Sequence, residues 1–386
     1  MNRLKKHRPL ILAALLAVCC GLCVWRLWAV SNALSSQKAA QRWKGAGERE
    51  YAQLSCFMPP MGQLSLDDLY KFRSDMAQKL KGAGYDIETE KGLYRDAWSA
   101  FRKVKVANGR RSGEVQAVAV GGNFFDFHPL RLMSGSYLTP DDVMDDRVLL
   151  DRETAWLLFG SSDVAGLSFS IEGVPFVAAG VYEHERDAFS KAAYGDTMQI
   201  YMSFAAYQRL NTVAPVRTDG SPAGAIAGAA ANAAANTVVD GTLNTAACYE
   251  LVIAEPVKGF AYSAVTDKFP LKTVMIVENT YRFETQRLFR LLQNRMERSM
   301  RTGTYYFPYW ENAARAAEDR AAAWMAGAAV SGVLPAVLLL YCLIRGAAHG
   351  RKKLEDDLLP DARAKGREFF REQARKRWEK KHPGEY

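Results

Sequence analysis

The feature that most constrains this chain is a pair of long apolar runs, Leu10–Val30 and Ala321–Ile344, which flank about 290 residues of mixed composition. Each run has roughly the 20 apolar residues that a helix needs to cross about 30 Å of hydrocarbon. Two spans would place the segment between them on one side of a membrane and both ends of the chain on the other.

The charges beside the two runs predict their orientation. The first eight residues carry four Lys or Arg and no acid, and the residues from Arg345 onward carry 13 Lys or Arg against 8 acids. The whole chain has a net charge of +9, so the part between these flanks is neutral. Cytoplasmic flanks are enriched in Lys and Arg. We therefore expect a two-pass plasma-membrane protein with cytoplasmic termini and with residues 31–320 outside. We expect the lipid bilayer, not nucleic acid, to be the partner of the basic flanks.

The first run also has the basic start of a cleaved signal peptide. An uncleaved anchor is favoured because the run is longer than a usual signal core, and because Trp25 and Trp28 stand where interfacial aromatics do.

The second run carries small residues at helical spacing. Gly327 and Ser331, like Ala328 and Gly332, are four residues apart and so share one side of a helix. Such a face permits close approach of a partner helix, and oligomerisation through the spans. The alternative is that small residues are simply common in spans. Neither span contains an acid, so the chain is not expected to form a transport path by itself.

Local patterns between the spans predict an α+β fold, an extracytoplasmic domain of mixed strands and helices. A helix from Leu66 to about Lys81 is capped by Ser65, and a short helix, Glu153–Phe159, is closed by Gly160. Glu172-Gly173 is typical of a hairpin turn. The predicted strands are Glu114–Val120, Arg147–Asp151, Leu167–Ile171, Pro175–Val181, Met198–Met202, Tyr249–Ala254 and Val274–Val277.

These elements predict seven segments along the chain. They are a cytoplasmic N-terminus (1–8), a first transmembrane helix (9–30), a stalk or linker (31–63), the extracytoplasmic core domain (64–284), an amphipathic helix and second stalk (285–320), a second transmembrane helix (321–344) and a basic cytoplasmic tail (345–386). The Ala- and Gly-rich stretch 211–244 is expected to be a loop insertion or a loose helix.

Two stretches carry a family resemblance: GGNFFDFHPLRLMSGSYLTPDD (121–142) and DRVLLDRETAWLLFGSSDVAGLSFSIEGVPFVAAGVYE (146–183). Their order and spacing resemble the MacB-like periplasmic core domain of ABC-transporter permeases. The segments CYELVIAEPVKGFA and PYWENAARAAED also look like members from Gram-positive bacteria. The resemblance implies an outer domain between the first two spans, driven by a separate ATPase. Members usually have four spans, so the chain resembles a truncated, two-span member that lacks the FtsX-like helices.

No catalytic, cofactor or metal motif is present, so the chain is predicted not to be an enzyme. It contains no G-x-x-x-x-G-K-[ST] and no H-E-x-x-H sequence. Glu183-His184-Glu185 and Ser161-Ser162-Asp163 are interpreted as solvated loops, and His128 as a turn residue. Whether Cys56 and Cys248 form a disulfide is open, because positions so far apart in the sequence do not show whether the two thiols are close in space.

An aromatic run precedes the second stalk, and it has two interpretations. The side chains either contact a partner or the outer headgroups, or pack back onto the domain. The residues are Tyr305, Tyr306, Phe307, Tyr309 and Trp310.

The sequence thus predicts a non-catalytic membrane subunit acting with ABC permease subunits and a separate ATPase in export or envelope-related transport. The alternative is a membrane-anchored sensor or adaptor whose outer domain binds a peptide, lipid or envelope component. Its basic tail, with Phe369, Phe370 and Trp378, would then lie on the membrane surface.

Overall fold

The computed structural model describes residues 2–59, 64–86, 90, 92–139, 144–213, 245–294, 305, 307–353 and 359–381. The chain forms two compact units, which are considered separately: Leu27–Ala323, and Met1–Arg26 with Trp324–Tyr386.

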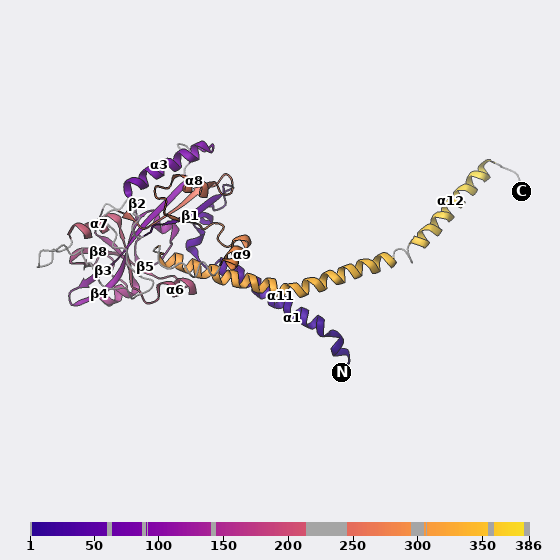
Figure 1. The fold of residues 1–386 in the computed structure, drawn as a ribbon, viewed down its shortest axis with the longest axis horizontal. Coiled ribbons are helices and arrows are strands. Elements are labelled where there is room, and N and C mark those ends of the chain that lie inside the picture. Colours follow the sequence, from indigo (N-terminus) through magenta and orange to yellow (C-terminus); the bar gives the residue numbers. More distant parts are fainter. Residues whose placement is uncertain are drawn as a thin grey trace. The chain divides into compact units, whose positions relative to one another are not determined.

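The centre of Leu27–Ala323 is a ten-stranded mixed sheet (Figure 1). Nine strands follow the order β12-β1-β11-β3-β4-β9-β6-β8-β5, and β7 pairs with β3 and β8. Most pairs are antiparallel, whereas β4–β9 and β6–β8 are parallel. The strands are β1 (Tyr51–Phe57), β3 (Tyr94–Asn108), β4 (Arg111–Gly122), β5 (Arg131–Gly135), β6 (Arg147–Asp151), β7 (Ser168–Ile171), β8 (Val174–Glu183), β9 (Gln199–Ser203), β11 (Cys248–Ala254) and β12 (Met275–Glu278). Two further strands, β2 (Leu64–Ser65) and β10 (Thr245–Ala246), form a separate pair.

Helices cover both faces of the sheet, and each face has its own apolar core. One core contains side chains of α3 (Leu66–Gly82), α5 (Arg152–Phe159), α7 (Phe204–Val213) and α8 (Phe260–Lys268). The other contains side chains of α2 (Ala39–Lys44), α4 (Phe124–Phe127) and the first turn of α11 (Tyr309–Lys353). The other helices among the described residues of this unit are η1 (Ser35–Lys38), α6 (Ala188–Tyr194) and α9 (Thr285–Gln293). The mixed arrangement confirms the predicted fold class.

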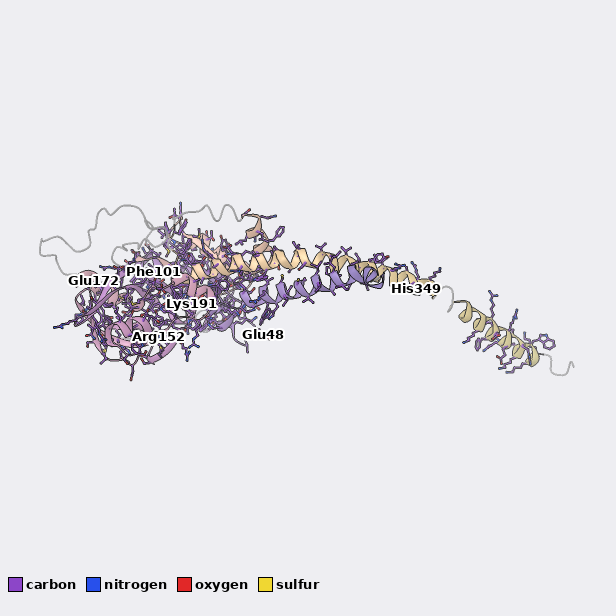
Figure 2. All side chains as sticks on the ribbon, turned by 90° about the horizontal axis from the view of Figure 1, so that it is seen from below. Glu48, Phe101, Arg152, Glu172, Lys191 and His349 are labelled. Carbon is purple, nitrogen blue, oxygen red and sulfur yellow. The ribbon has the colours of Figure 1, made fainter. Side chains whose placement is uncertain are left out.

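Elements with strong local signals are confirmed. Ser65 caps α3 by accepting a hydrogen bond from the Asp68 amide at 3.1 Å. Gly160 ends α5 in the left-handed conformation, at φ +74°. Glu172 and Gly173, with φ of 49° and 83°, turn the β7–β8 hairpin, the conformation of a type I′ turn. In Figure 2 Glu172 and Glu48 lie at opposite ends of the domain.

The predicted stalk over residues 31–63 is wrong for residues 51–57, which form β1 inside the sheet between β11 and β12. The polar residues of this strand made it look solvated, but their partners lie inside the domain. Gln53 is fully buried: its side-chain oxygen accepts from the Ala39 amide at 2.9 Å, and its Nε2 donates to the Ser36 carbonyl at 2.7 Å. The long strand β3 was not predicted, and the stretch 214–244 lies outside the described residues.

Cys56 and Cys248 are both free and buried, on adjacent strands. Cys56 stands opposite Tyr249, and Cys248 stands opposite Phe57. The two thiols belong to the cores on opposite faces of the sheet, so they do not pair. Burial raises the pKa of each thiol above its usual value, which keeps both protonated and unreactive.

The other unit consists of helices. It contains most of α1 (Asn2–Ser31), the later part of α11, and α12 (Leu359–Lys381). Two segments, Ile11–Ser31 and Tyr309–Lys352, belong to helices long and apolar enough to cross a membrane. Within this unit Cys20 Sγ lies 3.4 Å from the Ala328 carbonyl oxygen, so α1 and α11 are in contact there.

Candidate functional site

The first turns of α11 are inserted into the domain, on the sheet face that α2 and α4 also cover. Trp310 is 2% exposed. Its ring centroid lies 5.7 Å from that of Phe101 on β3, 5.6 Å from Phe124 on α4 and 4.3 Å from His128. An indole ring buried among aromatic groups contributes a large apolar contact area. Trp310, Glu311, Glu318, His128, Glu250 and Arg282 are together called the α11 seat.

A buried acid–imidazole pair lies beneath Trp310. His128 Nε2 and Glu250 Oε2 are hydrogen-bonded, and both side chains are almost completely buried. The second carboxylate oxygen of Glu250 accepts from the Ser55 hydroxyl at 2.9 Å, and that hydroxyl accepts from the Asn279 amide at 2.7 Å. The network therefore joins β11, β1 and the segments after α4 and β12.

A buried ion cluster fixes α11 from the other side. Arg282, in the segment after β12, is 1% exposed and donates two parallel hydrogen bonds to Glu311, at 2.8 and 2.6 Å. Its Nε lies 3.0 Å from Glu318, two turns further along α11. The guanidinium also donates to Asn279 at 3.0 Å and to Gln37 of η1 at 2.9 Å. Paired geometry of this kind is the strongest that Arg forms with a carboxylate.

The charges of the ion cluster shift the pKa values of Glu311 and Arg282. Burial by itself would raise the pKa of Glu311, but the Arg282 and Arg315 guanidinium groups outweigh that effect and hold the pKa below its usual value. Burial would likewise lower the pKa of Arg282, and the Glu311 and Glu318 carboxylates raise it instead. Both partners of the Arg282–Glu311 pair therefore stay charged over the physiological pH range.

Of the predicted aromatic run, Tyr309 and Trp310 are buried, as the packing interpretation requires. The Tyr309 hydroxyl donates to Glu185 at 2.9 Å. Phe307 is partly buried, with its ring centroid 5.3 Å from Phe57. Tyr305 donates to the Thr273 carbonyl at 2.9 Å, and Tyr306 lies outside the described residues.

The predicted small-residue face lies against α1 of the same chain. A Cβ added at Gly327 would meet Cys23 Sγ at 3.2 Å, and one at Gly332 would meet Cys20 Sγ at 3.3 Å. Ser331 donates to the Gly327 carbonyl of its own helix at 2.7 Å. Packing of Gly327, Ala328, Ser331 and Gly332 against a helix of another subunit stays a prediction.

The remaining sequence candidates agree only in part with the sequence interpretation. His128 directly follows α4, as a turn residue would, and its side chain is buried in the core. His184, interpreted as part of a solvated loop, is 15% exposed and faces Asp151. Ser161 accepts from the Asp163 amide at 3.1 Å within a loop, as expected.

Sequence reasoning missed Arg282, Glu250 and Glu311. The one available signal was the spacing of Glu311, Arg315 and Glu318, which places the three on one face of a helix. That pattern is equally typical of a solvent-exposed helix, so it did not indicate a buried partner.

The fold and the α11 seat define a mixed α/β domain attached to a long, partly apolar helix. Residues 65–245 match the MacB-like periplasmic core domain. The chain therefore contains a MacB-like periplasmic core domain, as the sequence resemblance predicted. Of the seat residues, only His128 lies inside the matched range.

Two solved structures are similar to part of this chain. The periplasmic region of MacB from Actinobacillus actinomycetemcomitans is 14% identical, with 65% of this chain and 94% of that chain covered and a TM-score of 0.38. The extracellular domain of the noncanonic ABC-type transporter YknZ from Gram-positive bacteria is 12% identical, with 59% and 100% covered and a TM-score of 0.35. No curated protein matches the sequence.

Removing the guanidinium of the seat is expected to destabilise the domain strongly. Arg282→Met leaves Glu311 and Glu318 buried without their main cation, which costs about 3–5 kcal/mol of unfolding free energy. Lys258→Met is the matched control, because Lys258 pairs with Glu284 at the surface, where a pair contributes at most about 1 kcal/mol. Denaturant unfolding of the full chain in detergent, followed by tryptophan fluorescence, measures both. Equal losses in the two variants would contradict the buried cluster.

The lowered pKa of Glu311 predicts a contribution to stability that depends on pH. The unfolded carboxyl has a pKa of about 4.3. The contribution is therefore complete above that value and is lost as pH falls through the lower, folded-state pKa. Between about pH 5 and pH 3 the wild type should lose unfolding free energy more steeply than Glu311→Gln. Parallel pH profiles for the two proteins would count against this assignment.

Proposed function

We propose that this protein is a non-catalytic membrane subunit that holds its MacB-like domain outside the cytoplasm and acts with permease and ATPase subunits in export or envelope-related transport. The matched family supports the class of protein. The sequence contains no Walker-type nucleotide motif, so ATP hydrolysis falls to a separate subunit.

The observation that carries this proposal is the course of α11. It is one helix from Tyr309 to Lys353, it includes a segment apolar enough to cross a membrane, and its first turns are buried in the domain. Because Arg282 holds both Glu311 and Glu318, the cluster fixes the helix to the domain at two positions about two turns apart.

Movement of the second span would therefore reach the domain through α11, and movement of the domain would reach the span. This coupling suits a subunit whose outer domain responds to work done at the membrane. The exposed apolar side chains along α1 and the later part of α11 are available for lipid or for spans of other subunits.

The proposed topology predicts which introduced cysteines react from outside the cell. Arg110→Cys lies in the exposed turn between β3 and β4, and Lys380→Cys lies on the exposed surface of α12. A membrane-impermeant maleimide should label position 110 in intact cells and position 380 only after permeabilisation. The parent chain, with Cys19, Cys20, Cys23 and Cys342 replaced by Ser, is the blank, since Cys56 and Cys248 are buried. Labelling of position 380 from outside would overturn the two-span arrangement.

The proposed partners predict the result of a purification in mild detergent. The tagged full-length protein should retain an ATP-hydrolysing subunit or a multi-span permease, detected by mass spectrometry and by ATPase activity in the eluate. Recovery of the chain alone across several detergents would contradict the proposal. Recovery with a regulatory protein and no ATPase would favour the sensor or adaptor.

A further inference from the structure

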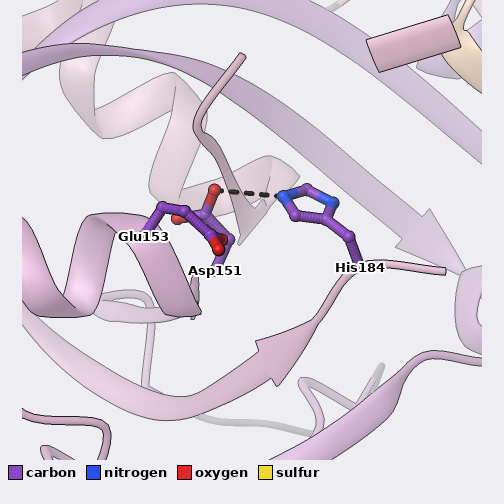
Figure 3. Close-up of side chains that lie close together, drawn as sticks. All are labelled: Asp151, Glu153 and His184. Atoms are coloured by element: carbon purple, nitrogen blue, oxygen red, sulfur yellow. Dashed lines mark hydrogen bonds and ion pairs between the residues drawn. The ribbon is translucent and has the colours of Figure 1, made fainter. Parts of the chain in front are cut away.

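Three side chains able to bind a metal meet at the carboxyl ends of two neighbouring strands. β6 and β8 are parallel, and Asp151, the last residue of β6, stands in register with Tyr182 of β8. His184 follows the end of β8, and Glu153 lies in the first turn of α5 (Figure 3). Because the carboxyl ends of parallel strands share an edge of the sheet, ligands often bind there. None of the three residues belongs to the α11 seat.

The spacing of their ligand atoms is close to that of a metal site. His184 Nε2 lies 3.1 Å from Asp151 Oδ2, and one ligand atom from each of the three residues falls within 4.8 Å of the others. Ligands about 2.0–2.2 Å from a tetrahedral ion lie roughly 3.4 Å apart. Asp151 and His184, 3.1 Å apart, are close to that separation, and Glu153, within 4.8 Å of both, needs to move by at most about 1.4 Å.

The Glu153 side chain can make this movement at little energetic cost. Its side chain is half exposed, and its nearest ionic partner is Arg152 at 3.5 Å, another half-exposed group. Exposed pairs of this kind contribute little to stability, so a carboxylate rotation that breaks the pair costs little.

The other two ligands are held in position. The Asp151 side chain is fully buried, and its carboxylate accepts the Thr154 amide at 2.7 Å and the Gln199 amide at 2.8 Å. The His184 ring contacts those of Tyr182 and Tyr194, at centroid distances of 5.2 and 4.3 Å. A ligand whose orientation is fixed in advance binds a metal at lower entropic cost.

The charge of the Asp151 carboxylate and nearby polar atoms without hydrogen-bond partners also favour a bound cation. The two amides orient Asp151 but bring no formal positive charge to its carboxylate. The Thr154 hydroxyl and Gln199 Nε2 are almost completely buried, and neither atom has a hydrogen-bond partner among the described residues. The neighbouring Glu183 is occupied by Arg131 and Arg186, so it does not compete for the site.

We propose that Asp151, Glu153 and His184 form a binding site for a divalent transition-metal ion of the Zn²⁺ type. One imidazole nitrogen with two carboxylates suits such an ion, whereas Mg²⁺ and Ca²⁺ prefer sites made of oxygen alone. Exposure rises from Asp151 through His184 to Glu153, so the fourth ligand position opens toward solvent. The ion would tie the start of α5 to the end of β8.

The test is a Zn²⁺ titration of the chelator-treated full-length protein in detergent, by calorimetry. Cys19, Cys20, Cys23 and Cys342 are replaced by Ser, so that the thiols of the apolar helices bind no ion. One Zn²⁺ per chain is expected, together with a rise in Tm on binding. His184→Gln and Glu153→Gln should each raise Kd by at least about tenfold and reduce the rise in Tm. Asp151 is left unchanged because it also caps α5.

Two controls separate this site from other Zn²⁺ contacts. His349→Gln removes a histidine from the other unit, and Glu114→Gln removes an exposed acid of β4, so neither should change Kd. Circular dichroism confirms that each variant folds. The proposal fails if the folded parent protein binds no Zn²⁺, or if His184→Gln leaves Kd unchanged. In the first case the contact between His184 and Asp151 is a hydrogen bond only.

Discussion

Arg282 is almost completely buried, and the need to satisfy its charge governs how the rest of the domain is attached to α11. A buried guanidinium costs several kcal/mol unless it is paired and hydrogen-bonded. Its partners come from three parts of the chain: Glu311 and Glu318 on α11, Asn279 after β12, and Gln37 in η1. One side chain thus joins the edge of the sheet to the segments that follow α1 and begin α11.

The α11 seat also buries ionisable side chains beneath the first turn of α11. Trp310 covers His128, and His128 in turn satisfies Glu250 in the middle of the sheet. Burying Glu250 is tolerable because both of its oxygens are hydrogen-bonded. Most of the seat lies outside residues 65–245, so the family core and its attachment to α11 are largely separate parts of the sequence.

The parts of the fold that could be predicted are those whose cause is local. The Ser65 cap, the Gly160 helix end and the Glu172-Gly173 turn each depend on residues within a few positions, and all three were predicted. β1 was missed because its Gln53 is paired with main-chain groups of residues 36 and 39, which no pattern within the strand indicates. The aromatic run before α11 was recognised, but its sequence is compatible with either an exposed or a buried position.

The sequence by itself determined the two apolar helices, the mixed class of the domain and the resemblance to the MacB-like core, because hydropathy, turn residues and motif spacing are properties of neighbouring positions. Tertiary structure alone decided that Arg282 meets Glu311 and that His184 meets Asp151. Both encounters depend on strand order and on the packing of α11 against the sheet. A charged residue in the sequence does not reveal whether its partner is water or a carboxylate brought to it by the fold.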